Sequence, residues 1–138
     1  MTDHRYMLDT NIVSDMVRNP QGAAVMRGRA AGMDSLCLSA VTICELRFGL
    51  RKKSSPELTS RVETYLTAVP ALPLEPDVGA LFAEIRYRLE SKGTPIGPYD
   101  MLIAAHALSL DLTLVTANTR EFSRVDGLRI ENWLEARP

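Results

Sequence analysis

Short apolar runs alternate with stretches of helical periodicity along most of the chain. The runs with the length of strands lie at 5–8, 36–39, 71–74 and 112–116. The last of them, "LTLVT", is rich in β-branched residues and has no polar alternation, which is typical of a parallel strand buried on both faces. Alternating strands and helices predict an α/β fold, a three-layer α/β/α sandwich with a mostly parallel central sheet.

The helical segments carry recognisable start and stop signals. We expect helices over 11–18, 22–32, 40–53 and 56–69, from Pro76 to Lys92, and in the apolar stretch 101–110. A turn rich in glycine and proline, "GTPIGPYD" (93–100), precedes the last of these helices, and an edge strand is expected within 128–133. No repeat or long linker interrupts the pattern, so we expect a single domain over residues 1–138.

Composition restricts the class of protein. With 46% apolar and 24% charged residues, the chain can bury a sizeable core. No apolar run is long enough to span a bilayer, and the N-terminal residues lack the apolar region of a signal peptide. Cys37 and Cys44 both lie in apolar stretches, and we interpret them as reduced core thiols. These features predict a cytoplasmic protein without a membrane partner.

Three acids and an asparagine lie close to the ends of the predicted strands. Asp9 follows the first strand, Glu45 lies early in the helix after the second, Asp100 opens the apolar helix, and Asn118 follows "LTLVT". Ligands of parallel sheets bind beyond the carboxyl ends of the strands, where the following helices begin. We therefore expect these four side chains to converge at one edge of the sheet.

Helix capping offers another explanation for each of these residues taken singly. Asp9 and Asn11 suit a cap, and "TICE" (42–45) and "NTRE" (118–121) fit capping boxes. Capping does not explain why acids would gather at one end of an apolar sheet. Neighbouring carboxylates repel one another, and a hard divalent cation such as Mg²⁺ or Mn²⁺ removes that cost through oxygen ligands. No histidine or cysteine belongs to the set, so zinc is not expected.

Four segments together resemble the PIN-domain ribonucleases that act as VapC-type toxins of bacterial toxin–antitoxin pairs. They are "MLDTNIVSD", "SAVTICELRFGLRK", "KGTPIGPYDMLIAAHAL" and "LTLVTANTREFSRVDGLRIENW". The resemblance runs in order over nearly the whole chain. It implies metal-dependent endonucleolytic cleavage of RNA, a homodimer, and inhibition by a VapB-type antitoxin protein.

The resemblance also implies a role for each acid. The acidic signature of the family falls on Asp9, Glu45 and Asp100, with Asn11 next to the first. Asp9 and Asp100 would hold Mg²⁺ or Mn²⁺, and Glu45 would complete the site and orient or deprotonate the attacking water.

The fourth position of the family signature is often Asp and falls here on Asn118. Asn118 would bind the metal or its water, with Thr116 supporting it from the strand end. With one carboxylate fewer, we expect one tightly held ion and a second that RNA recruits.

RNA binding must depend on local basic patches, because the net charge is −1. The candidates are Arg47, Arg51, Lys52, Lys53 and Arg120. Alternatively, these cations form a solvated helix face or pair with acids of the antitoxin. The turn "GTPIGPYD" resembles that of enterobacterial VapC toxins, which cut the initiator transfer RNA in its anticodon stem-loop. A transfer RNA is therefore the expected substrate, and its cleavage would inhibit translation.

Two other functions remain open from the sequence. A catalytically weak PIN-fold binding module, acting only through its antitoxin, would tolerate Asn118 in place of an acid. A phosphohydrolase also carries an acid after its first strand. An enzyme of the haloacid-dehalogenase type, however, requires an Asp where this chain has Asn11, and a lysine late in the chain, where none lies beyond Lys92.

Overall fold

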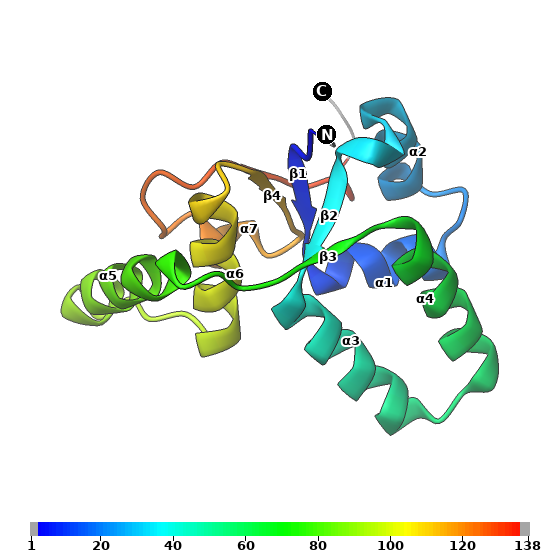
Figure 1. Ribbon diagram of the computed structural model, residues 1–138, viewed down its shortest axis with the longest axis horizontal. Helices are drawn as coiled ribbons and strands as arrows, with labels where there is room; N and C mark the ends of the chain where they lie inside the picture. Colours follow the sequence, from blue (N-terminus) through cyan, green and yellow to red (C-terminus); the bar gives the residue numbers. More distant parts are fainter. Residues whose placement is uncertain (1–2, 136–138) are drawn as a thin grey trace.

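The computed structural model describes residues 3–135, which contain a five-stranded, all-parallel sheet in the order β3-β2-β1-β4-β5 (Figure 1). The strands are β1 (Tyr6–Leu8), β2 (Leu36–Ser39), β3 (Ala71–Leu72), β4 (Thr113–Val115) and β5 (Ile130–Glu131). The predicted sandwich is confirmed. The chain builds outward from β1 to β3 and then crosses to the other side of β1 to form β4. This reversal places a crevice beyond the carboxyl ends of β1 and β4.

Helices of the described residues follow the predicted segments closely. They are α1 (Thr10–Arg18), α2 (Ala23–Ala31), α3 (Ala40–Lys53), α4 (Pro56–Ala68), α5 (Asp77–Ser91), α6 (Pro98–Ser109) and α7 (Thr119–Phe122), with a short 3-10 turn at Met33–Ser35. The helix α6 begins earlier than expected, inside the predicted turn. Pro98 at its start explains this, because the fixed φ of proline suits the first helical position.

Two predicted capping boxes are wrong. Thr42 lies inside α3, whose cap is the Ser39 hydroxyl that accepts from the Val41 N–H. Asn118 precedes α7 but makes no side-chain capping bond. Asp9, in contrast, caps α1 as expected and accepts from the Thr10 N–H. The acids of the two wrong motifs, Glu45 and Glu121, are therefore not explained by capping.

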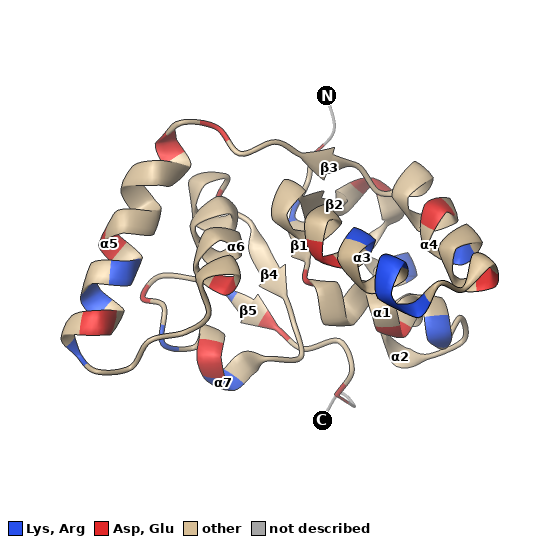
Figure 2. Ribbon diagram, turned by 90° about the horizontal axis from the view of Figure 1, so that it is seen from below, with Lys and Arg blue, Asp and Glu red and all other residues tan. Residues whose placement is uncertain are grey.

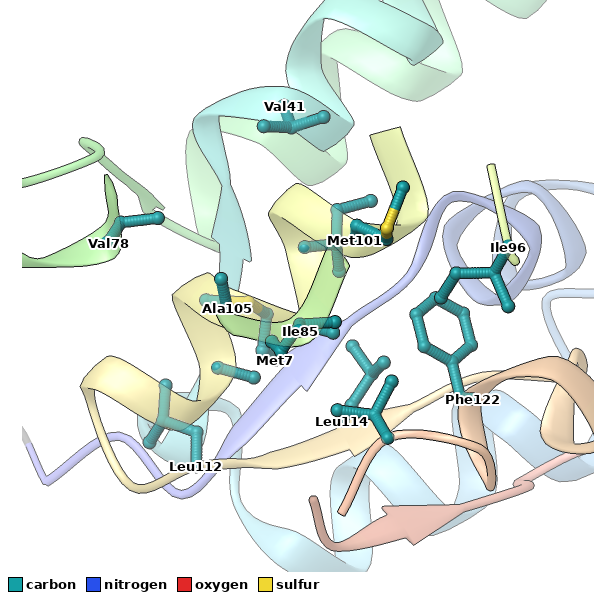
Figure 3. Packing of buried hydrophobic residues seen from close by; sticks show 14 of the residues in the cluster. Met7, Val41, Val78, Ile85, Ile96, Met101, Ala105, Leu112, Leu114 and Phe122 are labelled. Atoms are coloured by element: carbon teal, nitrogen blue, oxygen red, sulfur yellow. The ribbon is translucent and has the colours of Figure 1, made fainter. Parts of the chain in front are cut away.

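Side chains of the central strands alternate between two apolar cores, as the pleat requires. Met7 and Leu114 face one core, which α5, α6 and α7 cover, whereas Leu8 and Val115 face the other, which α1, α2 and α4 cover (Figure 1). Figure 3 shows the Phe122 ring of α7 within the first core. Burial on both faces explains the unbroken apolar run of "LTLVT".

Two further expectations need correction or limits. Cys37 is buried, but Cys44 is exposed and is not a core thiol. The predicted edge strand over 128–133 is reduced to β5, after which the Trp133 ring packs edge-on against Tyr6, with ring centres 5.1 Å apart. Within residues 3–135, no helix has the length and apolar character needed to cross a membrane.

Candidate active site

Asp9 is the fixed acid of the site. It lies at the end of β1, 4% exposed, and its N–H donates to the Val115 carbonyl at 2.8 Å. Its Oδ2 accepts from the Thr116 hydroxyl at 2.8 Å and the Asn11 amide at 3.2 Å, and Oδ1 accepts from the Thr10 N–H at 2.9 Å. Burial raises the pKa of Asp9, and the three hydrogen bonds oppose that rise. The carboxylate is thereby held in one orientation.

The loop after β4 is tied to the start of α1 by side chains predicted to support the site. The Asn11 Oδ1 accepts from the Ala117 N–H at 3.0 Å, and the Thr116 hydroxyl oxygen accepts from the Asn118 N–H at 3.0 Å. Thr116 is fully buried and Asn11 is half-buried. These bonds fix the crevice between β1 and β4 from both sides.

Glu45 approaches the crevice from α3. Its Oε1 accepts from the Thr10 hydroxyl at 2.7 Å, and its side chain is half-buried. Thr10 was not among the predicted site residues. The contact joins residues 35 positions apart, so no local sequence pattern indicates it.

Asp100 lies in the first turn of α6, where its surroundings disfavour the ionised carboxylate. Burial and, to a smaller extent, the charges of Asp9, Glu45 and Glu121 together raise its pKa to about 6. None of the side chains of residues 3–135 donates a hydrogen bond that would offset this. The structure therefore brings Asp9, Glu45 and Asp100 close enough for their charges to interact, as expected from the sequence.

Glu121 is a fourth carboxylate that the sequence reasoning missed. It lies in α7, and Figure 2 shows acidic positions on α7 and at the start of α6 near one another. The Asn118 amide donates to Glu121 Oε2 at 3.2 Å. Glu121 is thus a further acid near the three predicted ones, and the expectation of one tightly held ion stays a prediction. The available signal was the spacing of "NTRE", which was interpreted as a capping box.

The donor set fits a hard divalent cation by its chemistry, because all of its ligand atoms are carboxylate or amide oxygens. As the side chains stand, no three Asp, Glu, His or Cys residues within 3–135 lie close enough to form a complete ligand set. Asp9 and Glu45 are each held by a threonine hydroxyl, whereas no such donor restrains Asp100. Closure of the set therefore requires side-chain movement, and Asp100 is the acid that the described hydrogen bonds restrain least.

The predicted RNA-binding cations fall into two groups. Arg47 is ion-paired with Glu63 across α3 and α4. Among the described residues, Arg51, Lys52, Lys53 and Arg120 have no ion-pair partner, and Lys52 Nζ lies 4.9 Å from the centre of the Phe48 ring. The end of α3 therefore presents uncompensated positive charge, visible as the blue segment of that helix in Figure 2.

Two hollows flank the Thr10–Glu45 contact. The α4 hollow, of about 300 Å³, lies among α1, α3 and α4 and has the apolar walls Val17, Leu46, Leu50, Leu58 and Val62. The α6 hollow, of about 780 Å³, lies between α3 and α6 and is lined by Val41, Cys44, Phe48, Lys52, Tyr99 and Leu102. Thr10 and Glu45 line both hollows, so the acidic crevice opens to each of them.

Comparison with known proteins agrees with this geometry. The family model of the PIN domain matches residues 6–128. The chain belongs to the PIN-domain family. It is 38% identical over 130 residues to the "tRNA(fMet)-specific endonuclease VapC" of Shigella flexneri, covering 94% of this chain and 98% of the relative. It is 41% identical over 132 residues to the "Ribonuclease VapC2" of Haemophilus influenzae (strain Rd), with the same coverage of 94% and 98%.

A solved structure confirms the fold of this PIN domain. The Rickettsia felis VapBC2 complex bound to a DNA fragment from its promoter contains a chain that superposes with a TM-score of 0.86 at 30% identity, covering 93% of this chain and 98% of that one. The resemblance to VapC-type PIN domains that the sequence indicated is thereby confirmed. The assignment of individual catalytic and metal-binding residues stays a prediction.

Proposed function

We propose that this PIN domain is a metal-dependent endoribonuclease and the toxin of a VapBC-type toxin–antitoxin pair. One observation carries the proposal: Asp9, Glu45 and Glu121 all act on Asp100 through their charges, which raise its pKa, at the crevice between β1 and β4. Such an accumulation of carboxylates is unfavourable in itself, and a divalent cation neutralises it. The names of the relatives, which are ribonucleases and endonucleases, give the reaction class.

Each acid of the crevice has a proposed role. Asp9 and Asp100 would hold Mg²⁺ or Mn²⁺, Glu45 would complete the site and orient or deprotonate the attacking water, and Glu121 would add a fourth carboxylate. A bound ion supplies an activated water and neutralises charge on the phosphate that is cut. Asn118, whose amide donates to Glu121, acts by fixing that carboxylate.

We infer that the substrate is a structured RNA, specifically a transfer RNA. Support comes from the name of the Shigella relative and from the similarity of the "GTPIGPYD" turn, which leads directly into Asp100. The initiator transfer RNA, cut in its anticodon stem-loop, is the first candidate. Arg51, Lys52, Lys53 and Arg120 form no ion pair within residues 3–135 and can bind phosphates that the acids themselves repel.

A VapB-type antitoxin is the proposed protein partner. The α4 hollow supports this, since an apolar segment can fill its walls while a basic side chain of that segment reaches Glu45. The apolar residues of α1, α3 and α4 that line this hollow also pack in the second core, so only their outer edges are available. An antitoxin bound there would block the acidic crevice.

A homodimer is the proposed assembly, with the α6 hollow as its contact face. Phe48 and Tyr99, which both line this hollow, are 63% and 62% exposed, and exposed aromatic side chains on an apolar hollow are typical of a contact surface. The other walls include the apolar side chains of Val41 and Leu102, so a two-fold contact with a second copy can bury this face.

The proposed ribonuclease is tested by incubating antitoxin-free protein with purified total transfer RNA in Mg²⁺, Mn²⁺ or EDTA. A discrete fragment that requires both the metal and Asp100 supports the proposal, with Asp100→Asn as the inactive variant. Asp126→Asn is the matched control, because Asp126 is an exposed acid outside the crevice. Metal-independent cleavage, or equal cleavage by Asp100→Asn, would refute it.

Complete inactivity of the wild type with every RNA would favour a binding module that acts through its antitoxin. That alternative drew its support from the asparagine at position 118. Glu121, whose charge raises the pKa of Asp100, offers a fourth carboxylate and weighs against this alternative.

A further inference from the structure

Thr10 contacts two acids of the crevice at once. Its backbone N–H donates to Asp9 Oδ1 at 2.9 Å, and its hydroxyl donates to Glu45 Oε1 at 2.7 Å. An ionised carboxylate can only accept hydrogen bonds, so the hydroxyl is the donor. The residue thereby links the end of β1 to α3 through the acids themselves.

Glu45 needs such a restraint more than Asp9 does. It stands on the ridge between the α4 and α6 hollows, with open space on both sides. A glutamate side chain has three rotatable bonds, and among the described residues the Thr10 hydroxyl is the donor that holds its carboxylate. Asp9, in contrast, is buried and accepts three hydrogen bonds.

We propose that Thr10 is a positioning residue for Glu45, and this inference rests on the function proposed above. The hydroxyl bonds to Oε1, so Oε2 would remain available to a divalent ion or its water. Groups that orient a metal ligand in this way typically change metal affinity or activity by about 10- to 100-fold. A hydroxyl on the first residue of α1 is thus part of the site rather than only part of the helix start.

Two variants of Thr10 separate the hydroxyl from the rest of the side chain. Thr10→Val keeps the branched shape and removes the donor, whereas Thr10→Ser keeps the donor. Binding of Mn²⁺ alone, measured by titration calorimetry, is expected to weaken about 10-fold in Thr10→Val and by less than about twofold in Thr10→Ser. Thr64→Val is the control, because Thr64 is an exposed helical threonine whose hydroxyl bonds only to the Ser60 carbonyl.

A double-mutant cycle tests whether the effect passes through Glu45. In a Glu45→Ala background, adding Thr10→Val is expected to change Mn²⁺ affinity by less than about twofold, since the partner of the hydroxyl is gone. Equal Mn²⁺ affinity of wild type and Thr10→Val, or equal weakening by Thr10→Ser, overturns the role of Thr10. So does an undiminished effect of Thr10→Val in the Glu45→Ala background.

The same experiment distinguishes this inference from the proposed function. A wild type that binds no Mn²⁺ and cuts no RNA overturns both. A wild type that binds Mn²⁺ and cuts RNA, beside a Thr10→Val variant with unchanged affinity, overturns only the positioning role. Urea unfolding of each variant shows that it is folded, and Thr10→Ser keeps the test decisive if Thr10→Val does not fold.

Discussion

Thr116 and Asp9, 107 residues apart in the chain, meet in a buried hydrogen bond of 2.8 Å between the threonine hydroxyl and Oδ2 of the acid. The bond joins the ends of β1 and β4 at the reversal of strand order. The same hydroxyl oxygen accepts from the Asn118 N–H, so it serves both the acid and the loop that leads to Glu121. The geometry of the crevice thus depends on one small polar side chain.

Replacing Thr116 by Val should destabilise the protein by about 1 to 3 kcal/mol, because it removes one of the three hydrogen bonds to the buried Asp9 carboxylate and the side-chain partner of the Asn118 N–H. Thr116→Ser should retain most of the stability. Urea unfolding at neutral pH measures both. A Thr116→Val protein as stable as the wild type would mean that water replaces the hydroxyl and that the bond does not organise the crevice.

Asp100 should make stability depend on pH. Its pKa is raised to about 6, so the folded chain binds this proton more tightly than the unfolded chain. Ionisation of Asp100 therefore costs stability, and this cost grows from about pH 4 to about pH 6 and is complete above that range. Asp100→Asn should be more stable than wild type by about 1 to 2 kcal/mol near pH 7.5, a value reduced because the group is only half-buried.

The difference in unfolding free energy between Asp100→Asn and wild type should nearly vanish at about pH 4, where the wild-type carboxyl is protonated as well. Urea unfolding of both proteins across this range, in EDTA, measures it. A difference that stays constant with pH would show that the asparagine acts by packing and not by removing charge.

Divalent cations should stabilise the wild type, because a ligand that binds only the folded state raises the unfolding temperature. Mg²⁺ or Mn²⁺ at about 100 times the dissociation constant should add about 2.7 kcal/mol. The gain should be much smaller in Asp100→Asn and unchanged in Asp126→Asn. Thermal unfolding with each ion and with EDTA measures it, and an equal gain in all three proteins would place the ion elsewhere.

The predictable part of this fold is the part that follows from periodicity. "LTLVT" and "RYML" were recognisable as buried strands because neither face of β4 or β1 meets water, and the long helices were visible from their spacing and caps. The ends of the helices are harder to predict. Pro98 starts α6 inside a segment whose composition is typical of a turn. The exposure of Cys44 was missed because helical spacing indicates a side of α3 and not whether another element covers it.

The predictable part of the site is its set of acids at strand ends, and two contributors were missed for different reasons. Glu121 follows Asn118 at the spacing of a capping box, so capping was a sufficient explanation for its position in the sequence. In the structure, the Asn118 side chain does not cap α7 and donates to Glu121 instead. Thr10 stands next to a predicted acid, but its partner Glu45 belongs to another helix. Tertiary contacts of this kind have no local signal in the sequence.

The proposed dimer should depend on Phe48. Phe48→Glu places a charge in the apolar α6 hollow and should convert the dimer to a monomer, which light scattering after size exclusion measures. Tyr87→Glu is the matched control, because Tyr87 is an aromatic residue of α5 that is 72% exposed away from this hollow. A wild type that is monomeric, or a Phe48→Glu protein that remains dimeric, would exclude this face as the interface.

Glu121 and Asn118 make opposite predictions for the fourth position of the site. If Glu121 is the fourth carboxylate and Asn118 only fixes it, Glu121→Gln should lower RNA cleavage more than Asn118→Ala, by about 100-fold against about 10-fold. Glu121→Gln should also lower the pKa of Asp100, because the charge of Glu121 is one of those that raise it. Single-turnover cleavage and a carboxyl NMR titration measure the two effects. A larger loss in Asn118→Ala, with the pKa of Asp100 unchanged in Glu121→Gln, would return the fourth position to Asn118 and support the expectation of one tightly held ion.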